Sequence, residues 1–187
     1  MKTMNLQPRP KATMVYRRCA RLVAMLPATS EQISEALNLC EQTTGVWLRE
    51  LRALGVIAPI SYVQRKGRMY GPGDGKRRNI RQYDKPASGI YRFADALDAL
   101  KTRRTVADLA QAIDVHPRVA SEIVLALKAN KLIRVCGWIT NKNTSAPIYD
   151  RLPVSDVPKP ERLTKQETNA RYWSKYSARN GAQLGAE

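Results

Sequence analysis

The chain has little of what enzymatic catalysis and metal binding require. Its 187 residues include one histidine and three cysteines, and 16 acidic residues stand against 32 basic ones. It contains no His-Glu-x-x-His motif, no Gly-x-Ser-x-Gly motif and no acidic cluster. The histidine, His116, has no cysteine or carboxylate cluster beside it. We therefore expect no enzyme, no cofactor and no metal, although a lone Ser or Tyr nucleophile of the recombinase type stays open.

Long apolar runs and a disulfide framework are also absent. No apolar stretch approaches the roughly 20 residues that a membrane-spanning helix needs. The basic N-terminal segment has no apolar run after it, so we expect no secretory signal. Cys19, Cys40 and Cys136 are odd in number and far apart, which is typical of reduced thiols. These features predict a cytoplasmic protein without a membrane partner.

Positive charge is what the chain has in excess. Its net charge is +16 and its pI is about 10.2, which favours a polyanionic partner. Residues 64–92 hold nine basic side chains against Asp74 and Asp84, a net charge of 9 − 2 = +7. Their Gly-Pro-Gly-Asp-Gly run, residues 71–75, predicts a turn and then a linker. This run lacks the Lys and Ser/Thr of a phosphate-binding P-loop, so we expect no nucleotide site there.

Two segments of the chain repeat one pattern. Thr29 matches Thr105, and Leu51 matches Leu127, at the same offset in the numbering (105 − 29 = 127 − 51 = 76). Tyr16 matches Tyr91 at 91 − 16 = 75, so one insertion relates the two copies. Turns and helix ends repeat along with the apolar positions, which favours duplication over chance similarity of two amphipathic stretches.

Each copy has the same expected order of elements. A first helix carries apolar residues at helical spacing: Ala20, Val23 and Leu26 in the first copy, and Phe93, Leu97 and Leu100 in the second. A second helix opens at a Thr-x-x-Gln or Thr-x-x-Asp capping box. A short break, a third helix and a β-hairpin follow. The expected third helices are 41–54 and 117–130, the first hairpin strands are 57–63 and 132–139, and Tyr70 and Tyr149 lie on return strands. The pattern predicts a mainly α fold with small hairpins.

The segment SEQISEALNLCEQTTGVWLRELRALGVI, residues 30–57, resembles the helix-turn-helix of winged-helix regulators related to the MarR and ArsR families. In each copy this resemblance covers the second helix, the turn, the third helix and the entry to the strand. The stretches RMYGPGDGK and APIYDRLPVSDVPKPERLTKQETNARYWSKYSARN are similar to small phage and prophage winged-helix proteins. The resemblance implies two winged helix-turn-helix domains in tandem, followed by a basic C-terminal helix.

On this basis the chain divides into five expected parts. They are a flexible N-terminal segment (1–13), domain 1 (14–72), a basic linker (73–89), domain 2 (90–152), and a proline-rich exit with a basic C-terminal helix (153–187). The last helix carries cations at every fourth position, interleaved with Tyr172, Trp173 and Tyr176. Its aromatic side chains either meet nucleic acid or dock on the domain core.

In the winged-helix families the third helix enters the major groove of DNA. The resemblance therefore implies that Gln42 reads adenine, Thr43 a phosphate or thymine methyl, and Arg49 a guanine or phosphate. On the opposite face of this helix the resemblance places Leu39, Thr44, Leu48 and Leu51 in the core. For the outward face, a solvated polar surface is the alternative. The helix of the second copy meets either a second half-site or another subunit. The expected DNA-binding residues are Gln42, Thr43, Val46, Arg49, Arg65, Lys66, Arg68, Lys76, Arg77, Arg78, Arg81, Arg118, Ser121, Lys142, Arg171, Lys175 and Arg179.

The resemblance and the charge together predict sequence-specific binding of double-stranded DNA by a phage or bacterial transcriptional regulator. Its expected location is the cytoplasm of a bacterial or phage-infected cell. Two alternatives stay open: a replication or partition protein that binds an origin, and a phage protein that inhibits a host protein, including host immunity. Besides DNA, a second copy of the chain in a homodimer and a host protein stay open as partners.

Overall fold

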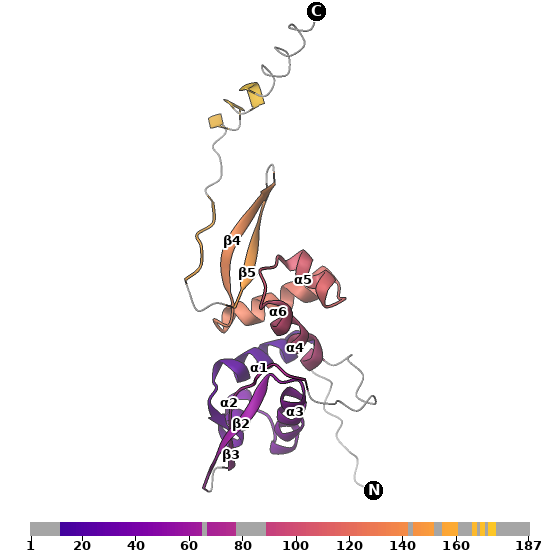
Figure 1. Ribbon diagram of the computed structural model, residues 1–187, viewed down its shortest axis with the longest axis vertical. Coiled ribbons are helices and arrows are strands. Elements are labelled where there is room, and N and C mark those ends of the chain that lie inside the picture. Colours follow the sequence, from indigo (N-terminus) through magenta and orange to yellow (C-terminus); the bar gives the residue numbers. More distant parts are fainter. Residues whose placement is uncertain are drawn as a thin grey trace, which may run out of the picture. The chain divides into compact units, whose positions relative to one another are not determined.

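The computed structural model describes residues 12–64, 67–77, 89–141, 144–151, 155–160, 166–167, 169–170 and 172–174. The contacts divide the chain once, into residues up to Val157 and residues from Pro158 onward. The first unit contains all the named elements (Figure 1). They are α1 (Ala12–Ala24), β1 (Ala28–Thr29), α2 (Ser30–Leu37), α3 (Glu41–Ala53), β2 (Ile57–Val63), β3 (Gly67–Pro72), α4 (Gly89–Ala99), α5 (Val106–Ala112), α6 (Pro117–Ala129), β4 (Arg134–Asn141) and β5 (Thr144–Asp150).

The prediction of helices combined with small β-hairpins is confirmed. The second helix of each copy begins where its capping box predicts. The Thr29 N–H donates to Gln32 Oε1 at 2.9 Å, and the Gln32 N–H donates back to Thr29 Oγ1 at 3.3 Å. Thr105 and Asp108 make the same reciprocal pair at the start of α5. These bonds satisfy N–H groups that a helix start leaves unpaired, so short sequences fix both boundaries.

The duplication is also visible in the backbone. Asn38 and Asp114 both follow the second helix of their copy, and both have φ = 49°. Gly55 and Lys131 follow the third helices, with φ of 72° and 56°. Both pairs have the offset of the sequence repeat (114 − 38 = 131 − 55 = 76). Left-handed residues are uncommon outside glycine, so their recurrence at matched positions supports two copies of one unit.

The strands repeat the same arrangement. One sheet has the order β1-β3-β2, with Ala28 opposite Tyr70, and the other pairs β4 with β5. Arg104, the counterpart of Ala28 at the repeat offset (104 − 28 = 76), bridges to Tyr149 of β5. The prediction for β2 is confirmed at both ends. The prediction that the next hairpin begins at residue 132 is wrong, because the Leu132 N–H bonds to Leu127 O and still closes the end of α6.

The predicted first helix ends too late. Leu26 was expected on its apolar stripe together with Ala20 and Val23, but α1 ends at Ala24. Leu26 precedes Pro27, and the proline ring disfavours helical backbone at the preceding residue. Its side chain is still partly buried against the core. The prediction that Leu26 is an apolar core residue is therefore confirmed, and the prediction that it belongs to the first helix is wrong.

The two copies share one core through exchanged helix contacts. Helix α1 packs on α4, and it also packs on α6 of the other copy. In turn α4 contacts α3 of the first copy. Figure 1 shows α1 and α4 side by side, with the two hairpins on opposite sides of them. The first unit therefore resembles a dimer whose two halves lie in one chain.

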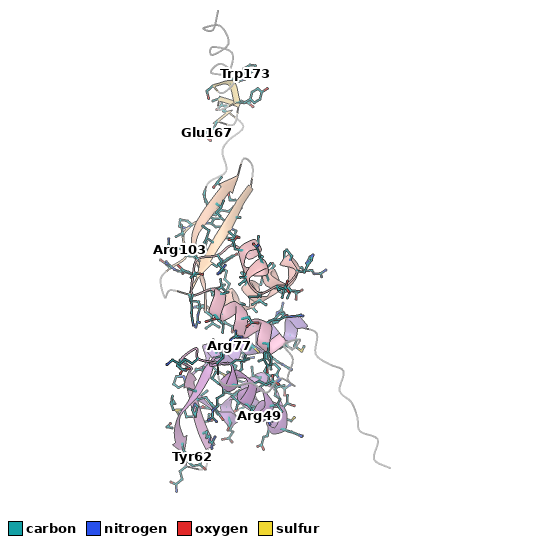
Figure 2. All side chains as sticks on the ribbon, turned by 45° about the vertical axis from the view of Figure 1, so that its right-hand side comes forward. Arg49, Tyr62, Arg77, Arg103, Glu167 and Trp173 are labelled. Carbon is teal, nitrogen blue, oxygen red and sulfur yellow. The ribbon has the colours of Figure 1, made fainter. Side chains whose placement is uncertain are left out.

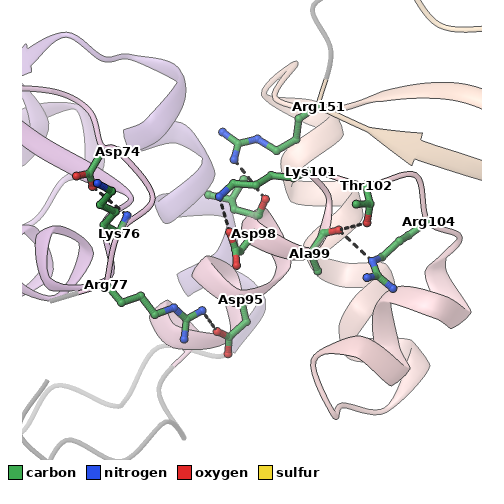
Figure 3. Close-up of polar contacts among 11 residues, drawn as sticks. Asp74, Lys76, Arg77, Asp95, Asp98, Ala99, Lys101, Thr102, Arg104 and Arg151 are labelled. Atoms are coloured by element: carbon green, nitrogen blue, oxygen red, sulfur yellow. Dashed lines mark hydrogen bonds and ion pairs between the residues drawn. The ribbon is translucent and has the colours of Figure 1, made fainter. Parts of the chain in front are cut away.

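Polar contacts surround α4 beside the same junction, and one of them joins the expected linker to the second copy (Figure 3). Arg77, from the expected linker, forms an ion pair with Asp95 of α4. Lys101 Nζ lies 2.6 Å from Asp98 Oδ1, and this contact is the main reason that the pKa of Asp98 is lowered. Arg151 Nη1 donates to the carbonyl of Leu97 at 3.3 Å. The described part of the linker thus forms part of the contact between the copies.

The exit from the second copy lies along β4. The Val157 N–H donates to Val135 O at 2.8 Å, and the Val135 N–H donates to Asp156 Oδ1 at 2.7 Å. Trp138 Nε1 donates to Val157 O at 3.1 Å. These bonds cover an edge strand whose open N–H and C=O groups would otherwise invite pairing with another chain. Residues 155–157 therefore belong to the first unit, whereas the sequence analysis assigned them to the C-terminal segment 153–187.

Candidate nucleic-acid interface

Helix α3 presents an exposed stripe on the surface. Gln42, Gly45, Val46 and Arg49 are exposed, at the three- and four-residue spacings that share one face of a helix. The opposite face buries the side chains expected in the core, Thr44, Leu48 and Leu51, and also Trp47. Trp47 was not assigned by the sequence reasoning. Its helical spacing from Thr44 and Leu51 was the signal that could have identified it.

Thr43 lies at the edge of this stripe and is half-buried. Its hydroxyl oxygen lies 3.1 Å from Cys40 Sγ, and the two share a hydrogen bond. This bond is the main cause that lowers the pKa of the exposed Cys40 thiol. A hydroxyl already engaged with Cys40 has less freedom to bond a phosphate or a base than Gln42 or Arg49 has.

A groove of about 330 Å³ lies between α3 and β3. Three arginines line it: Arg49 and Arg52 from α3, and Arg68 from β3. Arg68 was expected at the interface, whereas Arg52 was missed by the sequence reasoning. Its signal was its position three places after Arg49, which puts both guanidinium groups on one side of the helix.

The hairpin extends this basic edge. Tyr62 of β2 is opposite Arg68 of β3, so their side chains lie on the same face of the sheet. Tyr62 is 72% exposed, and Figure 2 shows it near the end of the hairpin, with Arg49 on α3. This aromatic residue was also absent from the predicted set. The helix and the hairpin together form a surface with three guanidinium groups and one exposed ring.

The three groove arginines differ from several other described cations in their ion pairing. Among the described residues, no ion pair includes Arg49, Arg52 or Arg68. Guanidinium groups that form no ion pair with the described carboxylates are suited to an anionic partner. The charge of the whole chain has the same sign, which adds a long-range attraction for polyanions.

The second copy differs at the matching positions. Arg118 Nε lies 3.8 Å from Glu122 of the same helix, and Lys128 Nζ lies 3.4 Å from Asp156. The counterpart of Arg49 at the repeat offset (49 + 76 = 125) is Leu125, which is 65% exposed. Leu125 alone of the apolar run 123–126 is exposed, because the other three side chains are buried in the shared core. At these matching positions the second copy therefore has two paired cations and an exposed leucine.

The remaining predicted residues are spread over several places. Lys76 is exposed, Ser121 is half-buried on α6, and Arg77 is engaged with Asp95. The structure brings together Gln42, Val46, Arg49 and Arg68, and it does not bring Arg77 or Arg118 to them as free cations. Arg65, Lys66, Arg78, Arg81, Lys142, Arg171, Lys175 and Arg179 lie outside the described residues.

The second unit offers an aromatic pair. Tyr172 and Trp173 are 63% and 61% exposed, and their rings meet edge to face with centroids 5.8 Å apart. All of its described helical positions between 166 and 174 are exposed. Such a segment buries little apolar area within its own unit, whereas ordering each residue costs about 1–2 kcal/mol of backbone entropy.

Truncation after Pro160 should therefore leave the melting temperature within a few degrees, because the described helical positions that it removes are all exposed. It should weaken DNA binding or dimerisation, since the expected basic stripe and the aromatic pair are lost. Thermal unfolding and duplex titration of the two lengths measure both effects. The full-length Trp173→Ala variant separates the aromatic contribution from that of charge. A steep fall in melting temperature with unchanged binding would place the tail in the core.

In a comparison with known proteins, no family model and no curated protein matches the chain. Within the described ranges, no helix has the length and apolar character to cross a membrane. No group of three or more His, Cys, Asp or Glu side chains in those ranges is placed to hold a metal ion. The feature of the described structure that bears most on function is the surface formed by α3 and the hairpin β2–β3.

Proposed function

We propose that the protein binds double-stranded DNA through two winged helix-turn-helix units in tandem, and that the first unit reads the sequence. The observation that carries this proposal is the groove between α3 and β3, whose three arginines have no ion-pair partner among the described residues. The groove adjoins the exposed stripe of the third helix, the element that winged-helix proteins place in the major groove.

The stripe and the groove would have different tasks. Gln42 and Arg49 project from the exposed face of α3, and their amide and guanidinium groups are the types that recognise adenine and guanine edges. Arg52 and Arg68 lie on the hairpin side of the helix and would contact phosphates, which fix register without reading sequence. The basic segment 64–92, with its net charge of +7, would add further backbone contacts.

A transcriptional regulator is the role that this arrangement supports best. One chain that carries both copies around a shared core can occupy one site without forming a dimer. A replication or partition protein of the same fold would cover adjacent repeated sites instead. Footprinting on a duplex that the protein selects from a random pool distinguishes a single protected site from a repeated series.

Salt titration tests whether DNA binding depends on phosphate contacts. With six to ten phosphates contacted, affinity for a labelled duplex should fall roughly 10³- to 10⁵-fold between 50 and 200 mM salt, because each contact releases condensed counterions. An acidic protein of similar size serves as the control competitor. A flat salt response, or no binding at low salt, would contradict duplex DNA binding.

A further inference from the structure

Gly45 lies inside α3, where no contact with the described protein requires a glycine. Glycine makes a helix interior less stable than alanine does. A Cβ atom built at Gly45 meets nothing within 4 Å, so the fold leaves room for a side chain. At Gly89, by contrast, the same Cβ would lie 2.9 Å from Val15 Cγ1. Gly45 therefore keeps open a space on the surface that no part of the described protein fills.

The surroundings of this space define what could fill it. Gly45 adjoins the groove, and the exposed stripe runs from Gln42 through Gly45 and Val46 to Arg49. The two ends of the stripe are polar, and its centre is apolar. The helical hydrogen-bond ladder is already established at Thr44, whose N–H donates to Cys40 O at 3.0 Å. The N–H of Gly45 therefore lies inside the ladder and is not available to a phosphate oxygen.

We propose that Gly45 and Val46 form a notch that receives the 5-methyl group of a thymine in the major groove. This inference rests on the proposed binding of duplex DNA. Base edges in the major groove present hydrogen-bonding groups and one apolar group, the thymine methyl. The side chain that Gly45 lacks leaves room beside Val46 for this apolar group, while Gln42 and Arg49 on either side can bond polar groups of the base edges. Gly45 is then a specificity-determining residue.

The first measurement uses Gly45→Ala in the full chain. The added methyl group should raise the melting temperature by roughly 2–4 °C, since it favours the helix and meets nothing. It should also weaken binding to the selected duplex roughly tenfold by occupying the notch. Gln111→Ala, at an exposed position of the helix α5, is the control and should leave DNA affinity unchanged.

The second measurement removes the methyl group from the DNA. After selection of a preferred duplex from a random pool, each thymine is replaced in turn by deoxyuridine. At one position the unsubstituted protein should lose about fourfold in affinity, the effect of one buried methyl group. Gly45→Ala should bind the thymine and deoxyuridine duplexes alike, because its own methyl group fills the space.

The outcomes separate this inference from the proposed function. If the protein does not bind duplex DNA, the proposed function itself fails. If it binds a selected site but no deoxyuridine substitution matters, the thymine assignment is wrong. Equal losses for Gly45→Ala on both duplexes would mean close approach to the DNA backbone instead. A lower melting temperature of Gly45→Ala would show that the fold requires the glycine, which also overturns the inference.

Discussion

Replacing Arg49, Arg52 and Arg68 together by alanine should weaken duplex binding roughly a thousandfold, at about tenfold for each lost contact. The three guanidinium groups line one groove and have no ion-pair partner among the described residues. The salt dependence should also become shallower, by about one in the logarithmic slope for each phosphate contact removed. Titration of a labelled duplex at several salt concentrations measures both quantities.

A control with the same net charge makes this prediction specific. Replacing Arg103, Arg118 and Lys128 by alanine also removes three positive charges, so both variants carry 16 − 3 = +13. These three cations pair with carboxylates of their own protein. We expect this variant to lose less than about tenfold. Equal losses would mean that only total charge attracts DNA, and an unaffected groove variant would place the DNA elsewhere.

The groove variant should remain folded, which keeps its binding result interpretable. Arg49 and Arg68 are exposed and Arg52 is half-buried. Surface substitutions away from packed or paired groups usually change stability by less than about 0.5 kcal/mol. Thermal unfolding of the groove and control variants should therefore give melting temperatures within a few degrees of the unsubstituted protein.

The local parts of this fold could be predicted from the sequence because short segments determine them. The capping boxes at Thr29 and Thr105 fix the starts of α2 and α5. Pro117 lies at the start of α6, where its missing N–H is not needed. Each of these features depends on residues within one helical turn, so no knowledge of tertiary packing was required.

The pairing of helices could not be predicted in the same way. An apolar stripe shows that a helix is buried but does not name the helix that covers it. Because the two copies carry similar stripes, contact of α1 with α6 and contact within one copy satisfy the same pattern. The ion pair between Arg77 and Asp95 depends on how the helices of the two copies pack, so the sequence showed only a basic linker at this position.

The exposed face of the helix in the candidate site could be predicted from the sequence, but the ion pairing of its basic residues could not. The exposed positions of α3 follow from helical periodicity, and Gln42, Val46 and Arg49 are found there. Whether a cation is free depends on neighbours that are distant in sequence. Lys128 meets Asp156 only because the exit segment lies along β4. Counting basic residues could not separate such paired cations from those of the groove.

Asp150→Asn should destabilise the protein by about 3–5 kcal/mol, the cost of breaking a buried ion pair on one side. Asp150 is 3% exposed, and its carboxylate accepts from Arg134 Nε at 2.8 Å and from Arg134 Nη2 at 3.3 Å. The neutral amide would leave the Arg134 guanidinium without its counter-charge. The melting temperature should fall by roughly 6–20 °C, at about 2–4 °C for each kcal/mol.

Unfolding should remain a single transition, because the two copies share one core and cannot melt separately. The exposed pair of Asp98 with Lys101 provides the comparison, and Asp98→Asn should cost less than about 1 kcal/mol. In the double variant Arg134→Met/Asp150→Leu, apolar side chains replace both charges, and most of the lost stability should return. Calorimetry of the three variants separates the explanations. A double variant as unstable as Asp150→Asn would show that the unpaired guanidinium is not the cause, and two transitions would show that the copies fold independently.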